Sequence, residues 1–396
     1  MGTGAIRVHE RTGETSPLRG ANTLKVIRGN LVTDLGIRKG QIEYTDRILY
    51  VGDHREFNGE LVDYGESLIA PGFIDIHVHG MAGYDIMDPD PESIHQISRH
   101  LATKGVTGFL ATLQTSSYKE IIKTLKHVSE TETTGAKLLG SHLEGPYISP
   151  VKIGAQKQNL REPITNELDD LLWAANGGLR LVTLAPEVKG GLVAVKYLVG
   201  HGVLVSAGHT DATYEEAKHA FDAGVQLLGH CWNGMRELHH REPGIIGAGL
   251  MDDRVLVELI ADCHHVHPAV LGLTVKLKGS DRVILISDSI KPAGLEPGKH
   301  IFDDRVYYVV DGLVKLESGV IAGSSIGLND AVRNMVERVG VSVTDAVQMA
   351  STTPASFLGL NKGRLEVDYD ADFVVLDKGF NVHETIVEGK TVYRVE

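Results

Sequence analysis

The stretch PGFIDIHVHG, Pro71 to Gly80, decides the fold class, because it is an apolar run that ends in polar side chains. Seven similar runs follow it, separated by amphipathic stretches typical of helices. These runs are VTGFLATL, LLGSHLEG, LRLVTLAPE, GVLVSAGHT, VQLLGHCWN, VLVELIADC and RVILISDS. Eight strand–helix units over residues 71–354 predict an α/β fold, a (β/α)8 TIM barrel, whose usual size is about 250 residues. An open doubly wound sheet is the alternative, but no GxGxxG motif opens the first unit.

Both flanks of this region have a different pattern, in which short apolar bursts alternate with turn residues. This pattern is typical of short antiparallel strands. Because chain ends often lie close together, residues 22–70 and 355–396 predict one small β-sandwich domain formed by both ends. Residues 1–21 have no periodicity and no apolar signal-peptide segment, so we expect a flexible N-terminal arm.

The composition excludes several classes of function. The 39 Lys and Arg residues against 52 Asp and Glu residues give a net charge of −13, which argues against nucleic acid or an anionic membrane as the main partner. Two cysteines do not make a disulfide framework, and no apolar run is long enough to span a membrane. We therefore expect a cytoplasmic protein.

Polar side chains close most of the predicted strands, at the end where a (β/α)8 barrel carries its chemistry. The second and fourth runs end in Gln114 and Glu187, which offer no obvious ligand set. The other runs end in His77 and His79, in His142 and Glu144, in His209, in His230, in Asp262 to His265, and in Asp288.

His77 and His79 are one residue apart on a strand, so both imidazoles point to the same face. An isolated HxH pair is a weak signal, because two packed or surface histidines give the same pattern. Glu144, His209 and His230 strengthen it, since imidazole and carboxylate groups are the usual ligands of zinc and related ions. The five side chains predict either one divalent ion with an open position or two ions bridged by the carboxylate.

Asp288 is an isolated charge at the end of a buried strand, where it needs a partner or a catalytic role. One interpretation makes it the partner of a metal-bound histidine. The other makes it a general base toward water and then a general acid toward the leaving group.

The polar segment from His230 to Leu250 is typical of a functional loop. Within it, His239, His240 and Arg241 form a local positive cluster that could bind a phosphate in an otherwise acidic protein. A solvated charge patch is the alternative.

Eight motifs occur in the order found in one known family: PGFIDIHVHG, HLEGPYISPVKIGAQ, GHTDA, GHCWNGM, HREPGIIG, ELIADCHHVHP, ISDS and IAGSS. In these motifs the sequence resembles the N-acetylglucosamine-6-phosphate deacetylases of the amidohydrolase superfamily. The resemblance implies metal-dependent hydrolysis of N-acetyl-D-glucosamine 6-phosphate to D-glucosamine 6-phosphate and acetate, in amino-sugar catabolism and recycling.

The resemblance also implies roles for individual residues. Glu144, His209 and His230 would bind the principal ion and His77 with His79 a second, so each subunit would hold one or two divalent ions, zinc or iron. Asp288 would be the acid and base, and His265 would orient the substrate. Substrate contacts would come from Ala155, Gln156, Asn233, Gly234, Arg241, Asp262, Cys263, His264, His265, Ile321, Ala322 and Gly323. A homodimer is implied, in which Arg241 reaches the phosphate in the neighbouring subunit.

Two departures from the family pattern alter the expected pocket wall. The chain reads HCWNGM and ADCHH where the family commonly reads HLYNAM and ADGxH, so Cys231, Trp232, Gly234 and Cys263 differ. The galactosamine epimer of the substrate is therefore an alternative. A cyclic-amide hydrolase is another, but those enzymes commonly use a modified lysine on the fourth strand, and LRLVTLAPE contains none. A non-enzymatic metal or sugar sensor would have lost a ligand or Asp288, and all six side chains are present.

Overall fold

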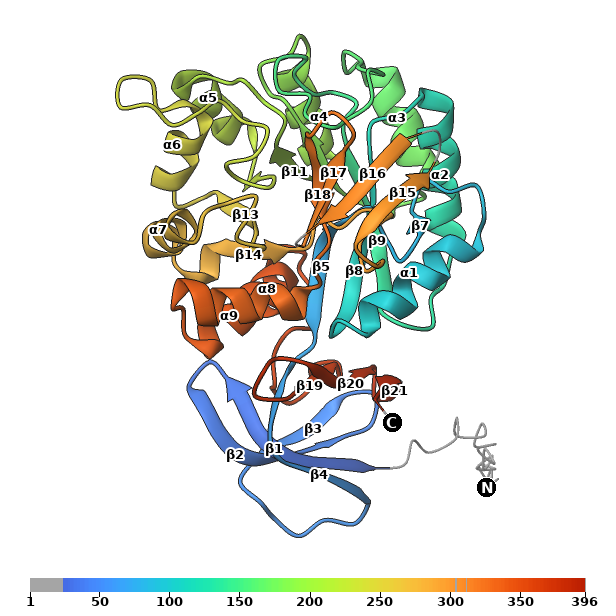
Figure 1. The fold of residues 1–396 in the computed structure, drawn as a ribbon, viewed down its shortest axis with the longest axis vertical. Helices are drawn as coiled ribbons and strands as arrows, with labels where there is room; N and C mark the ends of the chain where they lie inside the picture. The colour runs from blue at the N-terminus through green and yellow to red at the C-terminus, as the bar shows by residue number, and fades with distance from the viewer. Residues whose placement is uncertain (1–23, 303–304, 311, 396) are drawn as a thin grey trace, which may run out of the picture.

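The computed structural model describes residues 24–302, 305–310 and 312–395, so the predicted arm, residues 1–21, lies outside the described residues. A large barrel occupies the upper part of Figure 1 and a small β domain the lower part. The barrel contains eight parallel strands that are neighbours in chain order: β5 (Phe73–Val78), β8 (Val106–Leu113), β9 (Lys137–Glu144), β10 (Leu179–Leu184), β11 (Leu204–Ala207), β12 (Leu227–Leu228), β13 (Leu256–Ile260) and β14 (Val283–Ile286).

The first and last strands of the barrel meet where the Asp288 N–H donates to the His77 carbonyl over 2.9 Å. Each of the eight apolar runs therefore supplies one barrel strand, and the predicted (β/α)8 fold is confirmed. Apolar side chains such as Ile74, Ile76 and Leu181 fill the barrel interior, with Leu358 packed against them. The carboxyl ends of the strands, where the side chains are polar, are therefore available to form a functional site.

Helices cover the outside of the barrel (Figure 1). Two of them begin with reciprocal capping boxes, Ser117 with Glu120 and Thr213 with Glu216, which satisfy free N–H groups at the helix start. The α-helices are α1 (Glu92–Ala102), α2 (Tyr118–Glu130), α3 (Thr165–Ala174), α4 (Gly191–Gly200), α5 (Tyr214–Ala223), α6 (Gly244–Met251), α7 (Pro268–Lys278), α8 (Leu328–Asn334), α9 (Val343–Ala350) and α10 (Thr352–Phe357). A short 3-10 helix η1 (Ser280–Arg282), a π-helical segment η2 (Met335–Val339) and a strand pair, β6 (Gly80–Met81) and β7 (Tyr84–Asp85), also belong to the barrel domain.

The small domain is built from both ends of the described chain, as predicted. Strand β4 pairs antiparallel with β19 and so joins the N-terminal strands to the C-terminal ones. All seven strands lie in one hydrogen-bonded sheet: β1 (Lys25–Thr33), β2 (Gly36–Tyr44), β3 (Ile48–Gly52), β4 (Glu60–Pro71), β19 (Phe373–Leu376), β20 (Val382–Val387) and β21 (Lys390–Arg394). Ile27, Ile42 and Phe373 are in its separate apolar core.

A four-stranded antiparallel sheet follows β14, and sequence analysis did not predict it. Its strands are β15 (Gly298–Phe302), β16 (Arg305–Val310), β17 (Leu313–Leu316) and β18 (Ile321–Ser324). The sheet is drawn in orange at the front of the barrel in Figure 1. The Ser324 N–H donates to the Asp288 carbonyl over 3.0 Å, which ties β18 to the end of β14.

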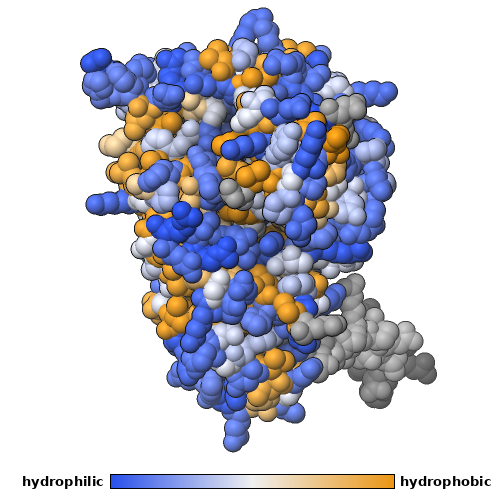
Figure 2. Space-filling view, in the orientation of Figure 1, coloured by the Kyte–Doolittle hydropathy of each residue, from blue (hydrophilic) through white to orange (hydrophobic). Residues whose placement is uncertain are grey.

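The surface in Figure 2 mixes hydrophilic and hydrophobic side chains over the visible face. Among the described residues, no helix combines the length and the apolar character needed to cross a bilayer.

A buried ion pair holds the chain between α10 and β19. The Lys362 ammonium, 5% exposed, lies 2.8 Å from a carboxylate oxygen of Asp370 and 2.8 Å from one of Asp372. We expect Lys362→Met to lower the free energy of unfolding by about 3–5 kcal/mol, because it leaves the buried Asp372 carboxylate without its cation, whereas Asp370 is partly exposed and keeps Arg47 at 3.5 Å. Urea unfolding at pH 7 measures this. The control, Lys39→Met, breaks an exposed pair with Glu66 and should cost at most about 1 kcal/mol. Equal losses in the two variants would contradict the prediction.

Candidate metal centre and active site

A cavity of about 210 Å³ opens at the carboxyl ends of the barrel strands. Glu144 at the end of β9 lies on its wall, with His209 and His230 from the turns after β11 and β12. The Nε2 atoms of His230 and His209 lie 3.0 and 3.2 Å from Glu144 Oε1 and 3.1 Å from each other. All three side chains are buried. They form one compact group that could hold a metal ion.

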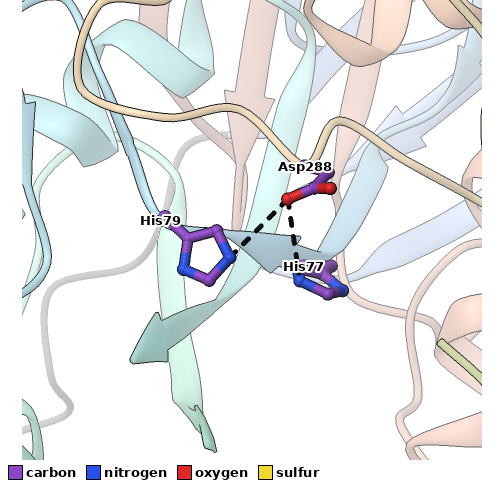
Figure 3. Close-up of side chains that lie close together, drawn as sticks. All are labelled: His77, His79 and Asp288. Carbon is purple, nitrogen blue, oxygen red and sulfur yellow. Dashed lines mark ion pairs between the residues drawn. The ribbon is translucent and has the colours of Figure 1, made fainter. Parts of the chain in front are cut away.

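His77, His79 and Asp288 form a second such group (Figure 3). Both imidazoles come from the end of β5 and point toward the Asp288 carboxylate, with Nε2 atoms 3.7 and 3.6 Å from Asp288 Oδ1. The Glu144 carboxylate lies 3.3 Å from His77 Nε2 and 3.2 Å from His79 Nε2. Glu144 is therefore placed between the two groups, where one carboxylate can serve both.

Hydrogen bonds fix the ring orientation of the four imidazoles. The Nδ1 atoms of His79, His209 and His230 lie 3.1, 2.8 and 3.1 Å from the carbonyl oxygens of Thr112, Lys152 and Asn233. A carbonyl oxygen only accepts, so each Nδ1 donates and each Nε2 presents its lone pair to the centre. His77 Nδ1 lies 3.0 Å from a Glu258 carboxylate oxygen instead.

The donor set fits a divalent cation. His77 Nε2 is buried and makes no hydrogen bond among the described residues, although it points into the cluster. Burial alone would lower the pKa of His77, but the carboxylates of Glu258, Glu144 and Asp288 raise it well above its usual value. For Glu144 the two effects have the opposite signs: burial alone would raise its pKa, but the neighbouring imidazoles, led by His77, lower it well below its usual value. The environment thus stabilises positive charge here, which is what a cation supplies.

Three of these residues have a left-handed backbone. The φ angles are +46° at His209, +31° at His230 and +45° at Asp288, and each residue follows the end of a barrel strand by two positions. Residues other than glycine adopt this backbone conformation at a cost of about 1–3 kcal/mol, and such strained residues are often found at functional sites. The tight turns bring all three side chains to the cavity.

Of the polar residues at the predicted strand ends, His142 belongs to neither metal group, although its ring packs edge-on against that of His77 with the centroids 4.7 Å apart. Its Nδ1 lies 3.1 Å from the Ile76 carbonyl oxygen and its Nε2 lies 2.8 Å from the Thr183 hydroxyl. Burial lowers its pKa well below the usual value, so the ring is neutral. His142 is a hydrogen-bonded core residue of the barrel.

Glu258 is a site residue that sequence analysis missed. It lies on β13, is fully buried and contacts both metal groups, since Oε2 accepts from the His230 N–H over 2.9 Å besides facing His77. A lone carboxylate within the apolar run VLVELIA was the available signal. Asp75 on β5 is a similar case, and burial raises its pKa to about 6.

Most of the expected substrate contacts come together. The expected contact residues that line the cavity are Ala155, Gln156, Asn233, Gly234, His265, Ile321, Ala322 and Gly323. Gln156 donates its amide to Glu144 Oε2 and accepts the Thr115 N–H over 2.9 Å, so it also orients the Glu144 carboxylate.

Asp262, Cys263 and His264 are not on the cavity wall within the described residues. Asp262 is buried behind His265, where its carboxylate lies 2.5 Å from His265 Nδ1 and accepts the backbone N–H groups of His264 and His265. Its position makes it the residue that holds the His265 ring in place.

Arg241 and Arg305 are placed differently relative to the cavity. Arg241 is exposed, contacts His240 Nε2 over 2.9 Å and is not on the cavity wall of its own chain, within the described residues. Arg305 on β16, which sequence analysis missed together with its sheet, donates to the Ala155 carbonyl over 3.4 Å. It brings positive charge against a loop that lines the cavity.

Residues 68–392 match the amidohydrolase family. The chain is 42% identical to N-acetylgalactosamine-6-phosphate deacetylase of Escherichia coli O157:H7, over 82% of this chain and 87% of that protein. It is 40% identical to N-acetylglucosamine-6-phosphate deacetylase of Vibrio furnissii, over 85% and 86%. A Mycobacterium smegmatis N-acetyl-D-glucosamine-6-phosphate deacetylase variant, solved with N-acetyl-D-glucosamine-6-phosphate, superimposes with a TM-score of 0.89 at 30% identity, covering 93% of this chain and 99% of that one. The chain therefore belongs to the amidohydrolase family and, within it, to the group of the amino-sugar-6-phosphate deacetylases.

Proposed function

We propose that the protein hydrolyses the N-acetyl amide of N-acetyl-D-glucosamine 6-phosphate, releasing acetate and D-glucosamine 6-phosphate. The observation that carries this proposal is the position of Asp288, whose carboxylate lies 3.7 and 3.6 Å from His77 and His79 on the wall of the same cavity as Glu144, His209 and His230. A carboxylate at that position can accept a proton from water and return it to a leaving group, as amide hydrolysis requires. The cavity beside it has the size of a small sugar.

Different residues would supply metal binding, proton transfer and substrate orientation. A divalent ion held by Glu144, His209 and His230 would lower the pKa of water and polarise the acetyl carbonyl. Asp288 takes the proton from the attacking water and returns it to the sugar nitrogen, which leaves as a neutral amine. His265, which lines the cavity and is held in place by Asp262, orients the substrate.

The identity and number of the ions are part of the proposal. Imidazole nitrogens with a carboxylate favour zinc or iron over the oxygen-preferring ions. We propose two ions per subunit at full occupancy: His77 and His79 would hold the second ion, and the Glu144 carboxylate lies within reach of both groups.

We further propose a cytoplasmic homodimer in which Arg241 reaches the phosphate bound by the neighbouring subunit. Arg241 is exposed and away from its own cavity, as such a role requires. Both cysteines are free thiols, which suits a reducing compartment.

Arg241→Ala is expected to raise KM for the phosphorylated sugar by about 10-fold or more, because a charge-assisted hydrogen bond is worth about 1.5–3 kcal/mol. Its kcat should change little, and the slow hydrolysis of unphosphorylated N-acetylglucosamine should not change. Steady-state acetate release measures both. Arg254→Ala, which removes an exposed arginine paired with Asp252 and Asp222, is the control. An unchanged KM for Arg241→Ala would contradict the role in phosphate binding.

The galactosamine epimer is the second candidate substrate. The identity to the Escherichia coli enzyme supports it, as does Gly234, the substituted residue of the HCWNGM motif that lines the cavity. Gly234 has a φ of +60°, and a Cβ there would lie 3.1 Å from His209 Nδ1, so the glycine keeps space beside a ligand. Cys231 is buried, and the Trp232 indole N–H donates to the Thr274 hydroxyl over 3.0 Å.

The deciding experiment measures acetate release from N-acetylglucosamine 6-phosphate, its galactosamine epimer and unphosphorylated N-acetylglucosamine, with metal content determined on the same sample. We expect the highest kcat/KM for the first substrate. A higher value for the epimer would favour the second candidate. If the metal-loaded protein releases acetate from neither sugar phosphate, both candidate functions are contradicted. Hydrolysis of dihydroorotate by the same sample would then test the cyclic-amide hydrolase alternative.

A further inference from the structure

We propose that Glu258 is the positioning residue for His77, and that it decides whether the second ion binds. The inference rests on the proposed metal centre and adds to it a residue outside the ligand set. Glu258 lies on β13, below the cavity, with its side chain fully buried. Its Oε2 atom lies 3.0 Å from His77 Nδ1 and 2.9 Å from the His230 backbone nitrogen.

The His77 ring is oriented differently from the other three ligand rings. His79, His209 and His230 donate to backbone carbonyls, whereas His77 faces a carboxylate. A carboxylate is a stronger acceptor than a carbonyl, and it increases the basicity of the opposite ring nitrogen as a metal ligand. The second Glu258 oxygen has no hydrogen-bond partner among the described residues, so its charge is little shared with other groups.

The charge of Glu258 also favours a second ion. Glu144 and Asp288 are the two carboxylates that belong to the metal groups themselves, and together they offset one divalent ion. A second ion brings two further positive charges into a buried site. Glu258 supplies another negative charge one imidazole away, where the surroundings screen it weakly.

The principal group does not depend on Glu258 for its ring orientation. His209 and His230 are held by the carbonyls of Lys152 and Asn233, and Glu144 is held by Gln156. Loss of the Glu258 carboxylate removes one acceptor from the His230 backbone but removes the entire orienting partner of His77. The second site should therefore weaken first.

The test compares Glu258→Gln and Glu258→Leu with the wild-type protein, each titrated with zinc after removal of bound metal. We expect two ions per chain in the wild type. Glu258→Leu should keep one. Glu258→Gln, whose amide oxygen can still accept from His77, should bind the second ion about 10- to 100-fold more weakly, as is typical when the partner of a metal-bound histidine is altered.

A matched control separates this effect from the loss of any buried carboxylate. Glu384 in the small domain is also buried, with its carboxylate bonded to Arg394. Glu384→Gln should keep both ions at wild-type affinity. Thermal unfolding of each variant, followed by circular dichroism, establishes that the proteins compared are folded.

The outcomes distinguish this inference from the proposed metal centre. Two ions in folded Glu258→Leu at wild-type affinity would overturn the inference alone, as would loss of both ions from that variant. A wild type that binds a single ion would overturn the two-ion site and the inference with it. If Glu258→Leu does not fold, Glu258→Gln decides: weaker binding of the second ion supports the inference, and unchanged binding overturns it.

Discussion

Asp288→Asn is expected to lower kcat by about 10²- to 10⁴-fold while the principal ion stays bound. Asparagine keeps the shape of the side chain but does not accept the proton of the attacking water or deliver it to the sugar nitrogen. The ligands Glu144, His209 and His230 are unchanged, so the first ion should remain. Acetate release under saturating substrate and metal content on the same sample are the two measurements.

A control for this variant is Asp330→Asn on α8. The Asp330 side chain is 18% exposed and that of Asp288 14%, so the two substitutions remove similarly accessible carboxylates. Asp330 pairs with Arg333 away from the cavity, and its variant should keep wild-type kcat. Turnover near the wild-type level in Asp288→Asn, with metal bound, would show that another group moves the proton.

Glu144→Ala is expected to abolish binding of both ions and to lower turnover by more than the about 10⁴-fold upper limit of acid and base catalysis alone. The reason is the central position of this carboxylate, whose oxygens lie within 3.3 Å of Nε2 of all four ligand imidazoles. Without it, the four rings face one another with no bridging charge. Metal analysis after dialysis, followed by acetate release with excess zinc, measures the effect.

His142→Asn is the matched control for Glu144→Ala. His142 is a buried imidazole on the same strand, but its ring bonds to Ile76 and Thr183 rather than to the metal groups. It should keep both ions, although its folding stability should fall. Retention of two ions by Glu144→Ala would refute the bridging role.

The sequence predicted the barrel well because parallel strands are covered on both faces and so appear as continuous apolar runs. The candidate ligands followed from the same reasoning, since the strand ends of a barrel converge. His142 and Glu144 show the limit of this reasoning, because both side chains face inward from the same strand. Their depth in the barrel makes one a core imidazole and the other a candidate ligand, and no sequence pattern records that depth.

Two features depended on contacts that only the folded chain supplies. Glu258 lies in the middle of a strand, and its function comes from a ring on β5, 181 positions earlier in the sequence. The sheet β15–β18 has short, half-exposed strands, which give a weak periodic signal. Its position over the barrel mouth depends on contacts such as that between Ser324 and Asp288.

The sheet that follows β14 has a consequence for the evolution of substrate range. Ile321, Ala322 and Gly323 on β18 form part of the cavity wall, whereas every candidate metal ligand precedes this sheet in the chain. Mutations between residues 298 and 323 can therefore reshape the space for the sugar while the hydrolytic apparatus is inherited intact. A duplicated gene could in this way acquire a new amide substrate through mutations in this one four-stranded sheet.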